Sequence, residues 1–300
     1  MRFNAIPAIQ IQGLTKRYGA RVAVNDIHLD VPAGVVLGLL GRNGAGKSTT
    51  INCALGLIAP SSGTTLFAGV GLDVAMRGRV AYVPETPAMY GWMTLKAHIE
   101  MRRRLYRSFD PARAQALADR FEISTEKPIR RLSKGGRTAA SLVLAFAQNA
   151  DMLFLDEPCS GLDPVAQRVA LDAIVSAASD GAALLFSSHD ISQIERVAEN
   201  VAIIDHGRIV INDNLETLRY SHKVVEAIFA DPPQMIDLAI HANIARIDVK
   251  GKIVRAYVTG EANGIADALS SRGARSARVL DRTLEELFIA ATTERAYDDL

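Results

Sequence analysis

The sequence predicts an α/β fold built on a parallel sheet, followed by a small α+β appendage, and three observations support this. A glycine-rich loop at 41–48 follows a short apolar strand and precedes a helix. The apolar runs 152–155 and 182–186 have the continuous hydrophobicity of buried parallel strands, with a helical segment between them. Beyond about residue 217, apolar residues alternate with charged ones, as in strands with one buried face.

The loop at 41–48 reads Gly-Arg-Asn-Gly-Ala-Gly-Lys-Ser and fits the P-loop pattern. The apolar run 35–40 precedes it and a helix over 47–57 is expected to follow, which is the context that the pattern requires. Glycines let the backbone aim several N–H groups inward, and the helix N-terminus adds partial positive charge. Lys47 would reach the β- and γ-phosphates of a nucleotide, and the Ser48 hydroxyl would hold Mg²⁺.

The other elements of residues 1–216 alternate as an α/β core requires. Strands are expected at 9–11, 23–31, 63–71, 80–83, 152–155, 182–186 and 201–204. Helices are expected at 94–107, 111–121, 136–147, 164–178 and 191–198. Asp110 and Pro111 give the second of these helices an acidic cap and a proline at its first position. The segment from about 86 to 150 is therefore a mostly helical insertion.

The appendage, residues 217–300, is expected to hold strands and two helices. The alternation at 245–250 predicts a strand, and Lys250-Gly251 can turn the chain into a second strand at 253–258. A helix at 263–271 and a strand at 277–280 follow. Thr283 and Glu286 form a capping box that opens a last helix.

Composition narrows the possible partners. The formal net charge of +1 produces no global field toward nucleic acid or anionic lipid, so no nucleic-acid partner is expected. Cys53 and Cys159 lie in expected core elements, which argues against a disulfide and fits a reducing compartment. No signal peptide and no bilayer-spanning apolar run is visible, so any membrane part must come from other chains.

Two acids follow the apolar run 152–155. Asp156 and Glu157 would emerge at the C-terminal edge of a buried strand, where ligands bind in parallel sheets. Asp156 is suited to Mg²⁺, directly or through water. Glu157 is suited to orient and polarise an attacking water. The pattern is weak alone and strong after a P-loop.

Over about residues 9–211 these motifs resemble, in their order, those of the nucleotide-binding subunit of an ATP-binding-cassette (ABC) transporter. Residues 41–49 match Walker A, and Asp156 and Glu157 match Walker B and the catalytic glutamate. Residues 132–136, Leu-Ser-Lys-Gly-Gly, resemble the signature motif, and residues 160–163 match the D-loop. The resemblance implies a RecA-like P-loop NTPase core with a helical subdomain at about 86–150.

The resemblance also implies a site shared by two chains. The Ser133 hydroxyl and the Gly135 N–H of a second subunit would grip the γ-phosphate from the side opposite the P-loop, in a two-fold homodimer. His189 matches the switch histidine, and Tyr18 matches the aromatic residue that stacks on adenine. The expected catalytic residues are Glu157 and His189, the expected Mg²⁺ ligands are Ser48, Glu85 and Asp156, and the expected ATP contacts are Tyr18, Gly41, Asn43, Gly44, Ala45, Gly46, Lys47, Ser48, Thr49, Ser133, Gly135 and Gly136.

Hydrolysis in such a dimer would drive a separately encoded membrane-spanning permease, with this chain in the cytoplasm at the inner face of the cell membrane. Two departures stand out: Glu85 replaces the glutamine of the family's Q-loop, and Lys134 replaces the first glycine of the signature. These departures, together with Tyr-Gly-Trp-Met-Thr at 90–94 and the segment 284–288, resemble a prokaryotic branch of the family whose partner is an ABC-2-type membrane protein. Members of this branch are often encoded beside GntR-type regulators. The resemblance to this branch suggests export as the direction of transport. The stretch 90–95 is either core or part of the groove for a permease.

Two other functions remain to be weighed. The first alternative is a soluble ABC-type ATPase without a transport role, but the chain has one P-loop and no long heptad coiled coil. The second alternative is a P-loop kinase or GTPase, but no guanine-reading Asn-Lys-x-Asp motif is present. The histidines show no ligand spacing, so no transition-metal site is expected.

Overall fold

The computed structural model describes residues 6–233 and 243–293. The chain divides into two compact units, Met1–Asn212 and Asp213–Leu300, which are treated separately below. The sequence-based division at 216/217 lies four residues from this boundary. The four residues between the two boundaries lead into helix α8 (Leu215–Ser221). The amino-acid composition does not change sharply there, so it does not mark the boundary.

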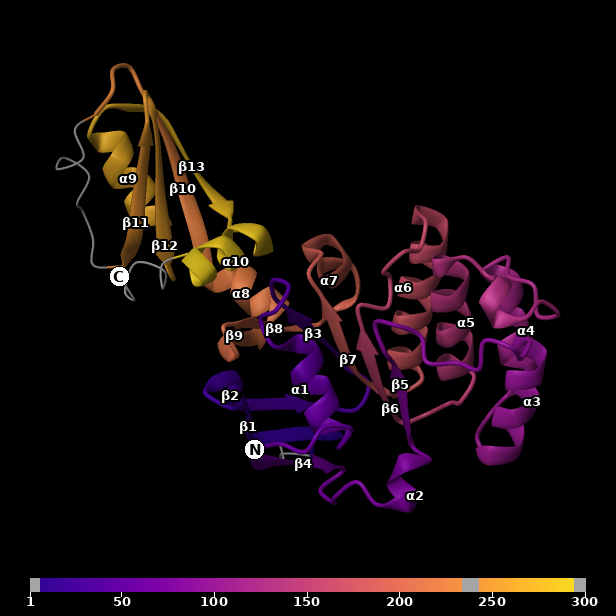
Figure 1. The fold of residues 1–300 in the computed structure, drawn as a ribbon. Coiled ribbons are helices and arrows are strands. Elements are labelled where there is room, and N and C mark those ends of the chain that lie inside the picture. The colour runs from indigo at the N-terminus through magenta and orange to yellow at the C-terminus, as the bar shows by residue number, and fades with distance from the viewer. Residues whose placement is uncertain (1–5, 234–242, 294–300) are drawn as a thin grey trace. The chain divides into compact units, whose positions relative to one another are not determined.

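A six-stranded sheet in the order β5-β6-β7-β3-β8-β9 forms the centre of the first unit (Figure 1). Its register is parallel from β5 through β8, and the central strands are buried on both faces. The strands are β3 (Val36–Leu40), β5 (Val80–Val83), β6 (Met152–Asp156), β7 (Ala183–Ser188), β8 (Asn200–Asp205) and β9 (Arg208–Asn214). The α/β fold with a parallel sheet is therefore confirmed, and β9 is a strand that the sequence analysis missed.

A second, antiparallel sheet pairs β1 (Ile9–Tyr18) with β2 (Arg21–Val31) and with β4 (Ser62–Phe67). Helix α1 (Lys47–Ala54) contributes Ile51 to a core that it shares with both sheets. Phe67 of the antiparallel sheet and Phe154 of the parallel sheet have ring centroids 6.0 Å apart in this core. Burial of such rings joins the two sheets into one unit.

Polar caps set the starts of most other helices of the first unit. Asp110 accepts hydrogen bonds from the first turn of α4, and Asp163 does the same for α6. The helices are α2 (Val74–Arg77), α3 (Leu95–Leu105), α4 (Pro111–Arg120), the 3₁₀ helix η1 (Ile129–Arg131), α5 (Lys134–Phe146), α6 (Pro164–Ser179) and α7 (Ile191–Val197). Helices α3, α4 and α5 pack on one another and form the mostly helical segment (Figure 1).

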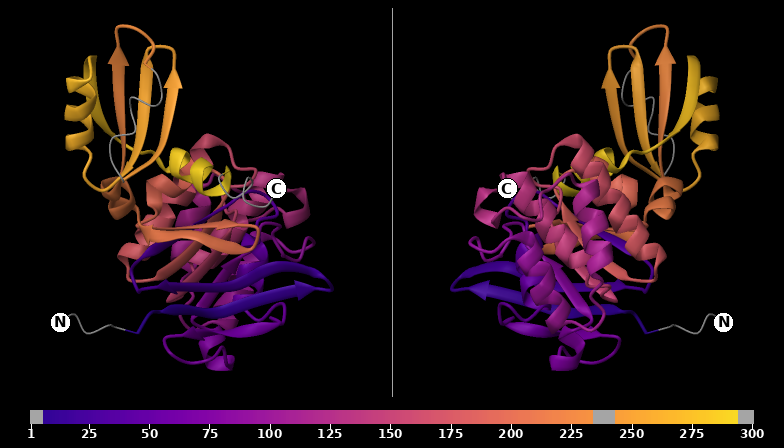
Figure 2. Two further views of the ribbon diagram at one scale, coloured as in Figure 1. Left: turned by 90° about the vertical axis from the view of Figure 1, so that its left-hand side faces the viewer. Right: turned by 90° about the vertical axis from the view of Figure 1, so that its right-hand side faces the viewer.

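The second unit is a four-stranded antiparallel sheet in the order β11-β12-β10-β13 with α9 against it (Figure 2). Its elements beyond α8 are β10 (His222–Phe229), β11 (Ile244–Lys250), β12 (Ile253–Thr259), α9 (Asn263–Ser271), β13 (Ala274–Asp281) and α10 (Leu284–Thr293). Strand β10 and α8 were not predicted. The capping box is confirmed, because Thr283 Oγ1 and Glu286 Oε2 each accept the other residue's backbone N–H at 3.2 Å.

Candidate nucleotide site

The P-loop links β3 to α1 in a backbone shape that needs glycine. Gly44 and Gly46 have φ values of +82° and +117°, in a region that side chains disfavour. A Cβ added at Gly41 would lie 2.6 Å from the carbonyl oxygen of Ile204, so only glycine fits there without a shift. The loop is therefore closely folded against β8 while its inner side stays open.

Helix α1 presents an uncapped N-terminus to the loop. No side chain in the described part of the chain caps it at Gly46, and its first turn holds no acid. Backbone N–H groups there are available to an anion, and the helix dipole favours a negative charge. Lys47, at the first position of the helix, is 6% exposed. Its ammonium donates a 2.7 Å hydrogen bond to the carbonyl oxygen of Gly41, which holds it across the loop.

The two acids lie at the C-terminal end of β6, and Ser187 of the neighbouring strand β7 positions them. Ser187 donates a 2.6 Å hydrogen bond to Asp156 Oδ1, and its hydroxyl also accepts the backbone N–H of Glu157 at 3.2 Å. Both acids are buried. Glu157 has a φ of +48°, a left-handed backbone that is costly for a residue with a side chain and is common at functional sites. This turn aims the Glu157 carboxylate into the space beside the P-loop.

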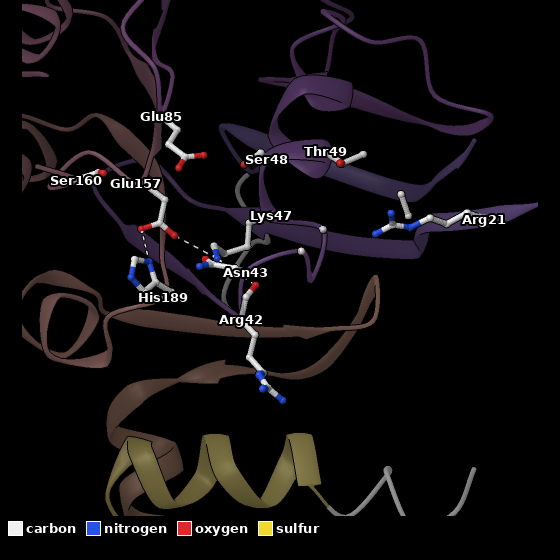
Figure 3. A pocket seen from close by; sticks show the side chains of 13 residues that line it. Arg21, Arg42, Asn43, Lys47, Ser48, Thr49, Glu85, Glu157, Ser160 and His189 are labelled. Carbon is white, nitrogen blue, oxygen red and sulfur yellow. Dashed lines mark hydrogen bonds and ion pairs between the residues drawn. The ribbon is translucent and has the colours of Figure 1, made fainter. Parts of the chain in front are cut away.

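Glu157 joins Lys47 to His189 (Figure 3). Its Oε1 lies 3.2 Å from Lys47 Nζ and its Oε2 lies 2.9 Å from His189 Nδ1. Oε1 is buried and, among the described residues, accepts no hydrogen bond of good geometry, so the contact with Lys47 is an ion pair only. A buried acceptor without a hydrogen bond is costly and marks a place where a water or a ligand group is expected.

These groups line a cavity of about 350 Å³ at the P-loop. Nine predicted site residues are among its walls, from both sides of the space (Figure 3). They are Asn43, Gly44, Gly46, Lys47, Ser48, Thr49, Glu85, Glu157 and His189. Of the other P-loop residues, Gly41 supplies the carbonyl that binds Lys47, and Ala45 is buried beneath the loop.

An adjoining cavity of about 630 Å³ contains all three expected magnesium ligands. Ser48, Glu85 and Asp156 share its wall, and they supply hydroxyl and carboxylate oxygens, the ligands that Mg²⁺ prefers. Tyr82 lies beside them and donates a hydrogen bond to Asn52 Oδ1 at 3.1 Å. Burial, with the carboxylates of Asp156 and Glu85, raises the pKa of Tyr82, so its phenol stays protonated at neutral pH.

The signature residues lie apart from both cavities within the chain. Ser133 caps α5, where its Oγ accepts the N–H of Gly136 at 3.0 Å. A Cβ at Gly135 would lie 2.5 Å from the carbonyl oxygen of Gly161, so the start of α5 is closely packed on the D-loop. Lys134 also lies on the D-loop, with its Nζ 3.4 Å from Ser160 Oγ. Ser133, Gly135 and Gly136 are therefore not among the residues that line these two cavities.

Tyr18 lies at the edge of the site rather than in its wall. It ends β1, pairs with Arg21 across the turn and is half exposed, with Lys16 Nζ 5.0 Å from its ring centroid. Arg21 itself lines the P-loop cavity, as do Arg42 and Ser160. These three residues were not among the predicted site residues. Two of them could have been predicted to line the cavity. Arg21 pairs with Tyr18, the residue expected to contact adenine, and Arg42 lies within the P-loop itself.

The two cysteines are free and buried. Burial, with the nearby carboxylates of Asp190 and Glu157, raises the pKa of Cys159 to about 12. A thiol in this state is neither a good nucleophile nor a good metal ligand at neutral pH. Although Cys159 lies next to the site, it therefore acts as core packing.

Comparisons with known proteins agree with this geometry. The family model described as ABC transporter matches residues 24–160. An uncharacterised ABC transporter ATP-binding protein of Bacillus subtilis (strain 168), YhaQ, is 32% identical over 71% of this chain and 73% of its own length. The Nod factor export ATP-binding protein I of Cupriavidus metallidurans is 30% identical over 97% of this chain and 99% of its own.

A solved structure described as the ATP binding subunit of an ABC transporter has a TM-score of 0.66 and 30% identity. It covers 71% of this chain and 92% of that one. Within residues 6–233 and 243–293, every helix is too short or too polar to cross a bilayer.

Proposed function

Because the chain belongs to the ABC transporter family, as one of its ATP-binding and ATP-hydrolysing subunits, we propose how its residues perform that work. The observation that carries the proposal is the meeting of Lys47, Glu157 and His189 in the P-loop cavity. The cavity thus brings together a cation suited to the phosphates and a carboxylate suited to the attacking water. A family member of this kind works with a membrane-spanning partner.

Binding uses the P-loop. The β- and γ-phosphates of ATP lie against the N–H groups at the start of α1 and against Lys47, which is already oriented by the carbonyl oxygen of Gly41. Entry of the phosphates gives Lys47 a stronger anionic partner than Glu157. The ion pair between the two residues then opens, and the Glu157 carboxylate becomes free to accept a proton. Tyr18 stacks on the adenine at the edge of the site.

Hydrolysis uses Glu157 as the general base. The carboxylate orients a water for in-line attack on the γ-phosphorus and takes its proton as the P–O bond to ADP breaks. His189 holds the carboxylate, because its Nδ1 lies 2.9 Å from Glu157 Oε2. Its ring also lines the P-loop cavity, where it would contact the γ-phosphate. Ser187 fixes the backbone from which Glu157 projects.

Magnesium fits the site because the adjoining cavity gathers hard oxygen donors. Ser48 and Asp156 would hold the ion, and Glu85 would reach it through water. When bound, Mg²⁺ supplies charge neutralisation for the developing negative charge on the phosphates. Asp156 is already oriented for this by the hydroxyl of Ser187.

Completion of the site needs a second copy of the chain. Ser133, Gly135 and Gly136 lie outside their own chain's cavities, at the start of a helix whose N-terminus can bind an anion. In a two-fold homodimer these three residues would contact the γ-phosphate from the side opposite Lys47. Hydrolysis removes this shared ligand, and the dimer opens.

The membrane partner docks, in this proposal, at the larger cavity and the aromatic segment beside it. Tyr90 and Trp92 are 57% and 70% exposed, with ring centroids 6.0 Å apart. His98 is buried and pins the segment, because its Nε2 accepts the N–H of Tyr90 at 3.2 Å. Exposed aromatic residues on a fixed loop suit a protein interface. The similarity to a Nod factor export protein favours export as the direction of transport.

The test is Glu157→Gln. We expect ATP to bind with nearly parental affinity, turnover to fall by about 10³-fold or more, and an ATP-bound dimer to accumulate, because only the proton acceptor is removed. Steady-state ATPase assays, equilibrium ATP binding and sedimentation velocity check the three parts.

Glu199→Gln is the matched control, since Glu199 is an exposed acid outside the cavity. Lys47→Ala supplies the opposite pattern, with ATP binding itself lost. Parental turnover in Glu157→Gln would show that the base is misassigned.

A further inference from the structure

Among the residues that the structure describes, the sheet of the second unit has one covered and one open face. Helix α9 covers the first face, where Ile265 and Leu269 pack with Val225, Val254 and their neighbours (Figures 1 and 2). Side chains alternate along each strand, so the residues between these apolar positions point to the opposite face. This second face, called the open face below, is not explained by ATP binding.

The strand register places the open-face residues in rows across the sheet. In the order β11-β12-β10-β13, one row reads Asp248, Arg255, Glu226, Arg278. Its charges alternate in sign from one edge to the other. Asp248 bonds Arg246 within its own strand, and Arg255 bonds Glu226 across the strand pair at 2.8 Å. Arg278 makes no ion pair with any described residue.

The next row is apolar at its centre. It reads Lys250, Ile253, Ile228, Ser276 in the same strand order. Ile228 and Ile253 are each 42% exposed, an unusual position for two adjacent isoleucines. In the row on the other side of the charged row, Val224 is only 3% exposed, so the centre of that row is covered within the chain, while Leu280 at the β13 edge is 42% exposed. The open face therefore consists of the charged row and the isoleucine row.

These two rows are complementary to themselves. Consider a second copy of the sheet that faces the first and is related to it by a two-fold axis. The axis runs parallel to the strands, between the two sheets, at the midpoint of β12 and β10. This rotation reverses the strand order of the second sheet, and each row then lies opposite the same row of the second copy. Asp248 then meets Arg278 of the second copy, and Arg255 meets Glu226 of the second copy. In the other row Ile253 meets Ile228 of the second copy. Aligned packing of this kind is the common way in which two sheets stack.

We propose that the open face is an interface through which two copies of this chain pair, independently of ATP. A second copy is the occupant that the alternating row fits, because an isologous contact requires a pattern that complements itself under the two-fold rotation. The isoleucines contribute the apolar contact. The partly exposed ion pairs add little affinity but set the register, since a shift by one strand would place like charges together.

The test measures self-association of the full chain without nucleotide, by sedimentation velocity at concentrations up to roughly 100 µM, where a weak dimer is populated. We expect a reversible monomer–dimer equilibrium. Arg278→Glu and Asp248→Arg should each raise the dissociation constant of the dimer by about tenfold or more, because each places like charges opposite each other. The double variant restores opposite charges at that contact and should return the constant to within about threefold of the parent.

Arg272→Glu is the matched control, an equally drastic change at the exposed end of α9 on the covered side of the sheet. Lys47→Ala should leave this dimer intact, which separates it from pairing through ATP. Circular dichroism of each variant checks folding. A parent that stays monomeric without nucleotide, single variants that associate as the parent does, or a double variant that fails to recover would overturn the proposal.

Discussion

Glu85 brings a negative charge to a position where it adjoins both the triphosphate cavity and the expected magnesium ligands. Its carboxylate also raises the pKa of Tyr82, so the charge is felt by the groups around it. A carboxylate attracts Mg²⁺ more strongly than an amide does but repels the phosphates. The attraction of Mg²⁺ and the repulsion of the phosphates oppose each other. Their balance determines how Glu85 affects the binding of Mg²⁺ and ATP.

We therefore expect Glu85→Gln to raise the Mg²⁺ concentration for half-maximal ATPase activity by about threefold or more, because a charged water-mediated ligand becomes a neutral one. Turnover should change more than the affinity for ATP. Steady-state assays at varied Mg²⁺ and direct nucleotide binding check both parts. Glu122→Gln, an exposed acid outside the cavities, is the control, and an unchanged Mg²⁺ dependence would remove Glu85 from the site.

At this scale the sequence predicted residues whose roles follow from the backbone next to them. Lys47 and Ser48 belong to a loop with its own pattern, and Glu157 directly follows an apolar strand. The sequence alone could not show that Glu157 bonds both Lys47 and His189, or that Ser187 fixes it. These contacts depend on which strands become neighbours in the sheet.

In the proposed dimer, the shared site depends on the start of α5. Its signature residues reach the D-loop through Gly135, which lies against the carbonyl oxygen of Gly161, and through Thr138, whose hydroxyl donates to the carbonyl oxygen of Ser160 at 3.2 Å. Ser160 in turn lines the P-loop cavity. In the proposed dimer, the helix that would contact the partner's nucleotide is therefore packed directly on a loop that lines its own chain's cavity.

Gly135→Ala should disturb this contact, because its Cβ would lie 2.5 Å from backbone that cannot swing away. We expect a loss of stability of about 1–3 kcal/mol from overpacking and a fall in ATPase turnover of about tenfold or more from the displaced loop. Thermal denaturation and ATPase assays measure these. Gly264→Ala, at a helical glycine with no neighbour within 4 Å, should leave both unchanged or slightly improve stability. Parental turnover in Gly135→Ala would contradict the coupling.

Element boundaries show where local signals end. Helix α4 begins at Pro111 as predicted, because its cap and first residue are both local signals. Helix α1 was expected to reach residue 57 but ends at Ala54. Strand β1 was expected at 9–11 but continues to Tyr18, because pairing with β2 and β4 compensates for polar residues that have little strand preference of their own. Strand β10 was also missed, and it is an inner strand of a sheet formed by distant segments.

The whole molecule combines two units with separate cores. All the P-loop cavity residues lie in the first unit, between Arg21 and His189. The second unit has its own four-stranded sheet and helix-packed core. A ligand that binds only the folded first unit should stabilise that unit and leave the second unchanged.

Differential scanning calorimetry of the full chain should therefore show two transitions. ATP with Mg²⁺ at about 100 times its dissociation constant should add about 2.7 kcal/mol to the first unit, a shift of about 5–10 °C for a domain of this size, with hydrolysis blocked by Glu157→Gln. The transition of the second unit should stay in place. Adding Lys47→Ala should abolish the shift, because the phosphates lose their buried cation, while Arg272→Glu in the second unit should retain it. A single transition that moves as a whole would mean that the two units unfold together, and the division at residue 212 would then have no thermodynamic meaning.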